Sequence, residues 1–180
     1  MAQHSLWEGP VIDVDVHAVT TRDLLLPYLD EFWHQFIRDR GWVGPPGAIV
    51  TYPSRAPSTA RPEWRPEDGR PAGSDVGLLK GHVLDPWSVD AAIVNCYYGI
   101  DSIRHPDLAR AITRATNDWL IGERLDRDPR LRASIVVPAR YPDMIVEEIE
   151  RVGAHPGFVQ VLVPVRCGRL YGQRVWHPRI

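Results

Sequence analysis

The chain of 180 residues is long enough for one domain with a sizeable hydrophobic core and too short for two ordinary ones. Hydrophobic residues make up 44% of it and charged residues 24%, close to the average for globular domains, which excludes a disordered chain or a coiled coil. The formal net charge is -2, and the 21 basic and 23 acidic residues are interspersed without a basic run. We therefore expect neither a nucleic-acid nor a membrane partner.

The N-terminus and the cysteines indicate a cytoplasmic protein. Residues 1–9 lack the cationic and then apolar pattern of a signal peptide, and no apolar run approaches the roughly 20 residues that span a bilayer. Cys96 and Cys167 are far apart in the sequence, and we expect both to be reduced thiols. Cys96 follows an apolar run, where a cysteine is typically a small buried hydrophobic residue.

Apolar runs rich in β-branched residues alternate with amphipathic stretches along the chain. The first run, Val11–Val16, predicts a strand, and a single helix is expected over residues 23–40 with Gly41 ending it. The expected apolar stripe of this helix consists of Leu25, Leu29, Phe32, Trp33, Phe36 and Ile37. A short helix over residues 78–84 then leads to a second strand, Ala91–Asn95.

Two more helices and two more strands follow. Pro106 opens a helix at a position where a missing amide hydrogen costs nothing, and this helix ends before Pro129. Its predicted buried face consists of Leu108, Ile112, Ala115, Trp119 and Leu125. Ala133–Val137 is the third predicted strand. Pro142 opens the next helix, which stops before Gly153 and leads to a fourth strand at Phe158–Val163.

This alternation of strands and helices predicts an α/β fold with a parallel sheet and right-handed crossovers. Three of the four strands are nearly continuous in Val, Ile, Ala and Leu, as expected for parallel strands that are covered on both faces. We expect a single domain over residues 1–180.

Residues 41–77 interrupt the alternation. They are rich in proline and glycine and have no sustained apolar period. A loop of this length in a compact domain is typically functional or disordered. Because it follows the first strand and helix, it could fold over the carboxyl ends of the strands as a lid, or it could be a solvent-exposed insertion.

The first strand carries Asp13, Asp15 and His17 at alternating positions, which predicts that they project from the same face, toward the interior of a closed barrel. Burying these groups without partners would cost several kcal/mol, and a divalent cation such as zinc would offset that cost. In parallel barrels the functional groups also lie at the carboxyl ends of strands. We predict that Asp15 and His17 are metal ligands. Asp13 is expected to cap the turn or to hold His17 in place, without binding the metal.

No other motif has comparable strength. None of the remaining histidines pairs with another at a spacing typical of a metal site, so we expect capping or solvated roles for them. These histidines include His34, His82, His105, His155 and His177. The sequence also has no glycine-rich phosphate loop after the first strand, no nucleophile elbow and no paired-cysteine site, which argues against a doubly wound nucleotide-binding sheet.

The opening segment Val11–His17 resembles the amidohydrolase-related family that includes aminocarboxymuconate-semialdehyde decarboxylase. The resemblance covers nearly the whole chain apart from the proline-rich segment. The other segments that carry it are Asn117–Leu120, Leu125–Leu131, Ala133–Pro138, Glu147–Arg151, Gly157–Val161, Tyr171–Gly172 and Trp176–Pro178.

This resemblance implies a distorted (β/α)8 barrel with one divalent metal, which we expect to be zinc. Asp15 and His17 match the two ligands of the family's first strand, although many relatives have His or Glu in place of Asp15. The family completes its site with a histidine of the fifth strand and an aspartate of the eighth, and neither has a counterpart before Ile180. We therefore expect the N-terminal half of a barrel, inactive by itself, and we assign no catalytic residue.

The resemblance implies a metal-dependent hydrolase in which activated water attacks the carbonyl group of a small-molecule substrate. Metal-assisted decarboxylation in the same kind of site is the alternative. A third possibility, from another class of function, is a non-catalytic α/β domain that acts by binding or by self-association, for example as a homo-oligomer that closes the barrel.

Overall fold

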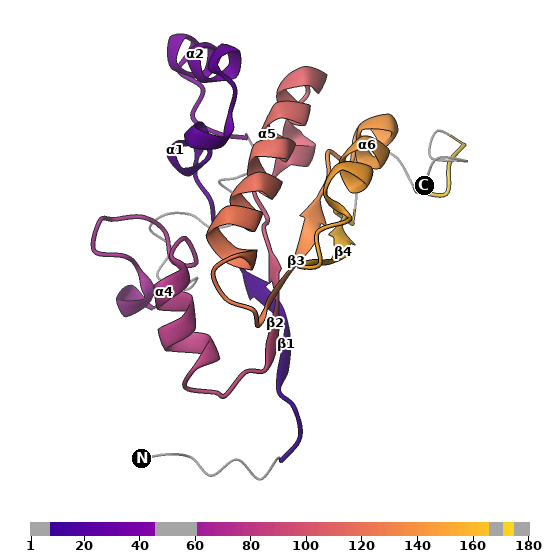
Figure 1. Ribbon diagram of the computed structural model, residues 1–180. Helices are drawn as coiled ribbons and strands as arrows, with labels where there is room; N and C mark the ends of the chain where they lie inside the picture. Colours follow the sequence, from indigo (N-terminus) through magenta and orange to yellow (C-terminus); the bar gives the residue numbers. More distant parts are fainter. Residues whose placement is uncertain (1–7, 46–60, 166–170, 175–180) are drawn as a thin grey trace.

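The computed structural model describes residues 8–45, 61–165 and 171–174. Four parallel strands in these ranges form one sheet in the order β1-β2-β3-β4 (Figure 1). Their bounds are Ile12–His17 for β1, Ala91–Asn95 for β2, Leu131–Val136 for β3 and Phe158–Leu162 for β4. Because consecutive strands are neighbours and are joined by segments that contain helices, the predicted α/β architecture is confirmed.

The α-helices are α1 at Arg22–Leu25, α2 at Glu31–Arg40, α4 at Val76–Leu79, α5 at Pro106–Leu120 and α6 at Pro142–Val152. Short 3-10 turns occur at Leu26–Tyr28, Pro62–Trp64 and Ile100–Ser102, and π-helical turns extend α4 over Lys80–Leu84 and α5 over Ile121–Leu125. The helices predicted after Pro106 and Pro142 are both present.

The single helix predicted over residues 23–40 is wrong. Pro27 has no amide hydrogen to donate, and it lies in a 3-10 turn that separates α1 from α2. The second helix has its own N-terminal cap, because a side-chain oxygen of Asp30 accepts a hydrogen bond from the backbone amide of Trp33 at 3.0 Å. The break also rotates the expected apolar stripe, so that Phe32 is 66% exposed.

The hydrophobic core lies between the helices and one face of the sheet. All five residues predicted for the buried face of the helix that begins at Pro106 are buried. They are Leu108, Ile112, Ala115, Trp119 and Leu125. They belong to one cluster with buried side chains of the strands, among them Val16, Val94 and Ile135. The amphipathic pattern of this part of the sequence therefore predicts the packing correctly.

The two outer strands leave apolar side chains exposed. Within the described ranges, β1 pairs only with β2, and β4 pairs only with β3. Ile12 and Val14 on β1 are exposed, as are Val159 and Val161 on β4. The sheet thus has two unpaired edges in the part of the chain that the structure describes.

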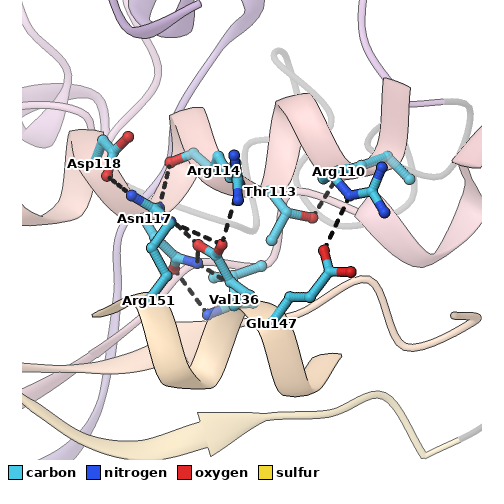
Figure 2. Close-up of polar contacts among 10 residues, drawn as sticks. Arg110, Thr113, Arg114, Asn117, Asp118, Val136, Glu147 and Arg151 are labelled. Carbon is cyan, nitrogen blue, oxygen red and sulfur yellow. Dashed lines mark hydrogen bonds and ion pairs between the residues drawn. The ribbon is translucent and has the colours of Figure 1, made fainter. Parts of the chain in front are cut away.

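A buried polar network joins α5 and α6 to β3 (Figure 2). The side-chain amide of Asn117 donates to the backbone oxygen of Val136 at 2.8 Å and to Glu148 at 2.7 Å, and its oxygen accepts from the Val136 amide at 2.9 Å. Arg151 in turn donates to both carboxylate oxygens of Glu148 and to Asp118. Because Asn117 and Glu148 are buried, these bonds replace those that water would otherwise supply.

We expect Asn117→Ala to lower the free energy of unfolding by roughly 2 kcal/mol or more, because it leaves buried groups of Val136 and Glu148 without a partner. The control is Asp118→Ala, which removes a partly exposed ion pair from the same helix and should cost less than about 1 kcal/mol. Urea denaturation of both variants measures the difference. Equal losses would contradict a structural role for the buried amide.

Candidate metal centre

Asp15 and His17 lie together at the carboxyl end of β1. The Nε2 atom of His17 is 3.1 Å from Oδ1 of Asp15, and their side chains are 36% and 65% exposed, respectively. In the part of the chain that the structure describes they lie on an open face of the sheet, so their burial in the interior of a closed barrel stays a prediction. Their proximity to each other agrees with the sequence pattern.

The spacing of these two donor atoms suits a shared metal ion. A nitrogen and an oxygen that each lie about 2.0–2.2 Å from one divalent ion, at ordinary coordination angles, are about 3–3.5 Å apart. The separation of 3.1 Å falls in this range, and it is also the length of a hydrogen bond between the two side chains. Within the described ranges, no three His, Cys, Asp or Glu side chains are grouped so that they could hold a metal, so the chain offers a two-donor arrangement there.

Asp13 does not join this pair. Asp13 pairs with Ala92 and His17 with Asn95, and an irregularity in β1 lies between Asp13 and Val16. Since Ala92 and Asn95 are three residues apart on β2, they face opposite sides of the sheet. The expectation that Asp13 shares a face with His17 therefore fails at this irregularity. Instead, Oδ1 of Asp13 accepts a hydrogen bond from the backbone amide of Asp15 at 3.1 Å.

Three polar side chains that the sequence analysis missed extend from Asp15 across the sheet. Asn95 donates to Oδ1 of Asp15 at 3.1 Å, Ser134 contacts Asn95 at 2.6 Å, and Gln160 donates to Ser134 at 2.8 Å. Each is a polar residue within or at the end of a largely apolar strand. This pattern was visible in the sequence, but the residues could not be connected without the register of the strands.

A cavity of about 420 Å³ lies at the carboxyl ends of β2, β3 and β4. Its walls are largely apolar, with contributions from Ile100, Val136, Val137, Leu162 and Val163, and Asp101 is the only charged residue among those that line it. Tyr97 connects the cavity to the candidate metal centre, because it lines the cavity and its ring lies 5.0 Å from the ring of His17, centroid to centroid. Partial burial and the charge of Asp15 both raise the pKa of Tyr97.

The end of the proline-rich segment packs directly behind His17. The backbone oxygen of Gly73 accepts hydrogen bonds from the Val19 amide at 3.0 Å and from Arg124 at 3.1 Å. Arg124 also donates to the backbone oxygen of Ser74, and burial lowers the pKa of its guanidinium group to about 10. Residues 46–60 lie outside the described ranges, so a lid over the site stays a prediction.

Two of the other described histidines and the described cysteine have structural roles. His105 caps α5 by accepting a hydrogen bond from the amide of Leu108, and His155 accepts one from the amide of Gly157. Cys96 is a buried free thiol, and burial raises its pKa to about 12. His177 and Cys167 lie outside the described residues. Among the described helices, none is long and apolar enough to cross a membrane.

The parallel sheet, its helical connections and the polar groups at the strand ends define part of a (β/α)8 barrel. The model of the amidohydrolase family matches residues 12–179, and the chain belongs to this family. A search of curated proteins found no match.

Solved structures of two proteins resemble the chain. Two structures of 5-carboxyvanillate decarboxylase from Novosphingobium aromaticivorans, both with manganese and a nitrobenzoic acid, align with a TM-score of 0.63 and 18% identity. Each of these alignments covers 94% of this chain and 46% of the decarboxylase chain. An amidohydrolase from Mycobacterium avium subsp. paratuberculosis aligns with a TM-score of 0.54 and 19% identity, over 84% of this chain and 48% of its own. The chain thus spans just under half the length of these proteins.

Replacement of Gly73 should disturb the end of β1. Gly73 has a φ of +81°, and a Cβ atom there would lie 2.7 Å from the backbone oxygen of His17. Gly69 has a similar φ of +84° but no atom within 4 Å of such a Cβ, so it is a matched control. We expect Gly69→Ala to cost only about 1–2 kcal/mol of backbone strain, and Gly73→Ala to cost clearly more.

Urea denaturation of the two glycine variants measures this difference. An NMR spectrum of the histidine ring protons should show a shift at His17 for Gly73→Ala alone. Equal stabilities and an unchanged His17 signal would contradict the close packing of Gly73 against β1.

Proposed function

We propose that this chain contributes to a divalent-metal-dependent enzyme that decarboxylates a small, ring-containing carboxylic acid, with Asp15 and His17 as two of the metal ligands. The observation that carries the proposal is the 3.1 Å separation of the His17 and Asp15 donor atoms, linked through Tyr97 to an apolar cavity. Polar donors beside an apolar cavity are the usual form of a small-molecule site.

The donor set supports a first-row divalent ion. One carboxylate oxygen and one imidazole nitrogen suit zinc and manganese alike. The manganese in the decarboxylase structures makes Mn²⁺ the first ion to test in place of the zinc expected from the sequence. At identical ligands Zn²⁺ should bind more tightly than Mn²⁺, so availability and the remaining ligands would decide which ion is used.

The charges around the cavity constrain how an acid substrate would bind. Asp101 repels a carboxylate from the cavity itself, and the described lining offers no cation to attract one. An acid with an apolar ring would therefore bind best with its ring against Val136 and Leu162, which line the cavity, and its carboxylate toward Asp15 and His17. A divalent ion held by Asp15 and His17 would supply positive charge there, which would attract the carboxylate and offset the negative charge that develops when the carbon–carbon bond breaks.

Hydrolysis of a carbonyl compound is the second candidate. The exposure of Asp15 favours it, because water reaches this end of the sheet directly. The family also takes its name from hydrolysis of this kind. Both reactions need the same two donors, so they differ in the product and not in the dependence on Asp15 and His17.

Metal binding is tested by titrating the chain with Mn²⁺ and measuring the free ion by electron paramagnetic resonance. Asp15→Ala and His17→Ala should each raise the Kd for Mn²⁺ by at least about tenfold. Removing a residue that only orients a metal ligand already lowers metal affinity by about this factor, so removing a ligand should cost at least as much. A second His–Asp pair in the chain, His155 and Asp126, has its atoms 3.5 Å apart and lies on neither β1 nor the cavity. Asp126→Ala and His155→Ala are therefore matched controls that should leave the Kd unchanged.

The reaction is tested by supplying the manganese-loaded chain with 5-carboxyvanillate and following release of carbon dioxide, and in parallel with nitrophenyl esters. Release of carbon dioxide that disappears in Asp15→Ala supports decarboxylation, and ester cleavage with the same dependence supports hydrolysis. If the chain binds Mn²⁺ but turns over neither substrate, the result agrees with the expectation that this part of a barrel is inactive by itself, and Mn²⁺ binding remains the test of the proposed site.

A further inference from the structure

The polar side chains beside the candidate metal centre form a chain that crosses all four strands. The participants are Asp15 on β1, Asn95 on β2, Ser134 on β3 and Gln160 on β4, with one contact between each pair of neighbours. Asn95 and Ser134 are buried, and most of the other residues of their strands are apolar. Buried polar groups cost stability unless they are bonded, so their placement calls for a specific role.

The direction of this hydrogen-bond chain follows from the chemistry of its members. The side-chain amide of Gln160 donates to Oγ of Ser134, so the hydroxyl hydrogen of Ser134 is free to point to Oδ1 of Asn95 at 2.6 Å. With its oxygen turned toward Ser134, Asn95 must present its NH2 group to β1. There it donates to Oδ1 of Asp15 at 3.1 Å and to the backbone oxygen of Val14 at 3.4 Å.

All donors thus point toward the Asp15 carboxylate. The oxygen that accepts from Asn95 is the same Oδ1 that lies 3.1 Å from Nε2 of His17. Asp15 itself is 65% exposed, while Asn95 is nearly fully buried. Asn95 is therefore the rigid group that fixes the exposed carboxylate, and each bond in the chain polarises the next.

We propose that Asn95 is a positioning residue that orients Asp15 for the metal, and that Ser134 fixes the orientation of the Asn95 amide. This inference rests on the proposed metal site at Asp15 and His17. Partners that orient a ligand are known to change metal affinity by about 10–100-fold when they are removed. The register of the sheet, which pairs His17 with Asn95, is what brings the amide to Asp15.

The test compares Mn²⁺ binding by the wild-type chain, Asn95→Leu and Ser134→Ala, with electron paramagnetic resonance as the readout. Asn95→Leu keeps the approximate shape of the side chain and removes its donor, and it should raise the Kd about 10–100-fold. Ser134→Ala frees the Asn95 amide to turn over and should raise the Kd by a smaller factor. Thr116→Val is the matched control, because it removes another buried hydroxyl group, on α5, that bonds to a backbone oxygen and not to this chain.

A second readout separates positioning from general stability. The side-chain NH2 signals of Asn95, observed by NMR in the metal-free chain, should exchange slowly with solvent in the wild type and faster in Ser134→Ala, while they stay unchanged in Thr116→Val. If Asn95→Leu does not fold, Ser134→Ala still tests whether the orientation of the Asn95 amide affects Mn²⁺ binding.

The outcomes distinguish this inference from the proposed function. If the wild type binds Mn²⁺ and Asp15→Ala does not, the metal site stands. An unchanged Kd in folded Asn95→Leu and Ser134→Ala would then overturn the role of Asn95 alone. If the wild type does not bind Mn²⁺, the metal site fails first. Fast exchange of the Asn95 NH2 group in the wild type would still, independently, contradict the hydrogen-bond chain.

Discussion

The register between β1 and β2 is the constraint on which the candidate site depends. It places His17 beside Asn95, and it includes the irregularity between Asp13 and Val16. A slip of one residue would turn Asp15 and His17 toward the helices and would separate Asp15 from Asn95. The hydrogen bonds of Asn95 to Asp15 and to the backbone of Val14 favour the observed register, because a slipped strand would leave this buried amide unpaired.

Two buried polar networks hold the same sheet from opposite faces. On the helix-covered face, Asn117 and Glu148 connect α5 and α6 to the end of β3 (Figure 2). On the other face, Asn95 and Ser134 connect β2 and β3 to the donors of β1. The first network fixes the helices on the sheet and the second orients a carboxylate at its edge. Both place polar groups among apolar neighbours, and both satisfy them with partners from other elements.

Local patterns in the sequence were sufficient for most of the fold. The positions of Pro106 and Pro142 predict where α5 and α6 begin, and the apolar stripe of α5 predicts its buried face. The apolar run Ala91–Asn95 coincides with β2. The apolar periodicity before Gly41 predicts one long helix, but Pro27 has no amide hydrogen to donate and ends the regular helical turn. The proximity of Asp15 and His17 follows from strand alternation, which is also a local property.

The rest of the site depends on contacts between strands that local patterns do not encode. Asp13 leaves the face expected for it because of an irregularity in pairing, which alternation within one strand cannot reveal. The contact of Asn95 with Asp15 spans 80 residues, and that of Ser134 with Asn95 spans 39. Neither could be predicted until the order and the register of the strands were known. The packing of Gly73 behind His17 is of the same kind.

The central claim is that Asp15 and His17 bind one divalent ion at the carboxyl end of β1. The most direct measurement is anomalous X-ray scattering at the manganese edge from crystals of the chain grown with Mn²⁺. We expect one anomalous peak within coordination distance of both Oδ1 of Asp15 and Nε2 of His17, with Asn95 still bonded to the carboxylate. A peak elsewhere on the chain, or none beside these two atoms at saturating Mn²⁺, would contradict it.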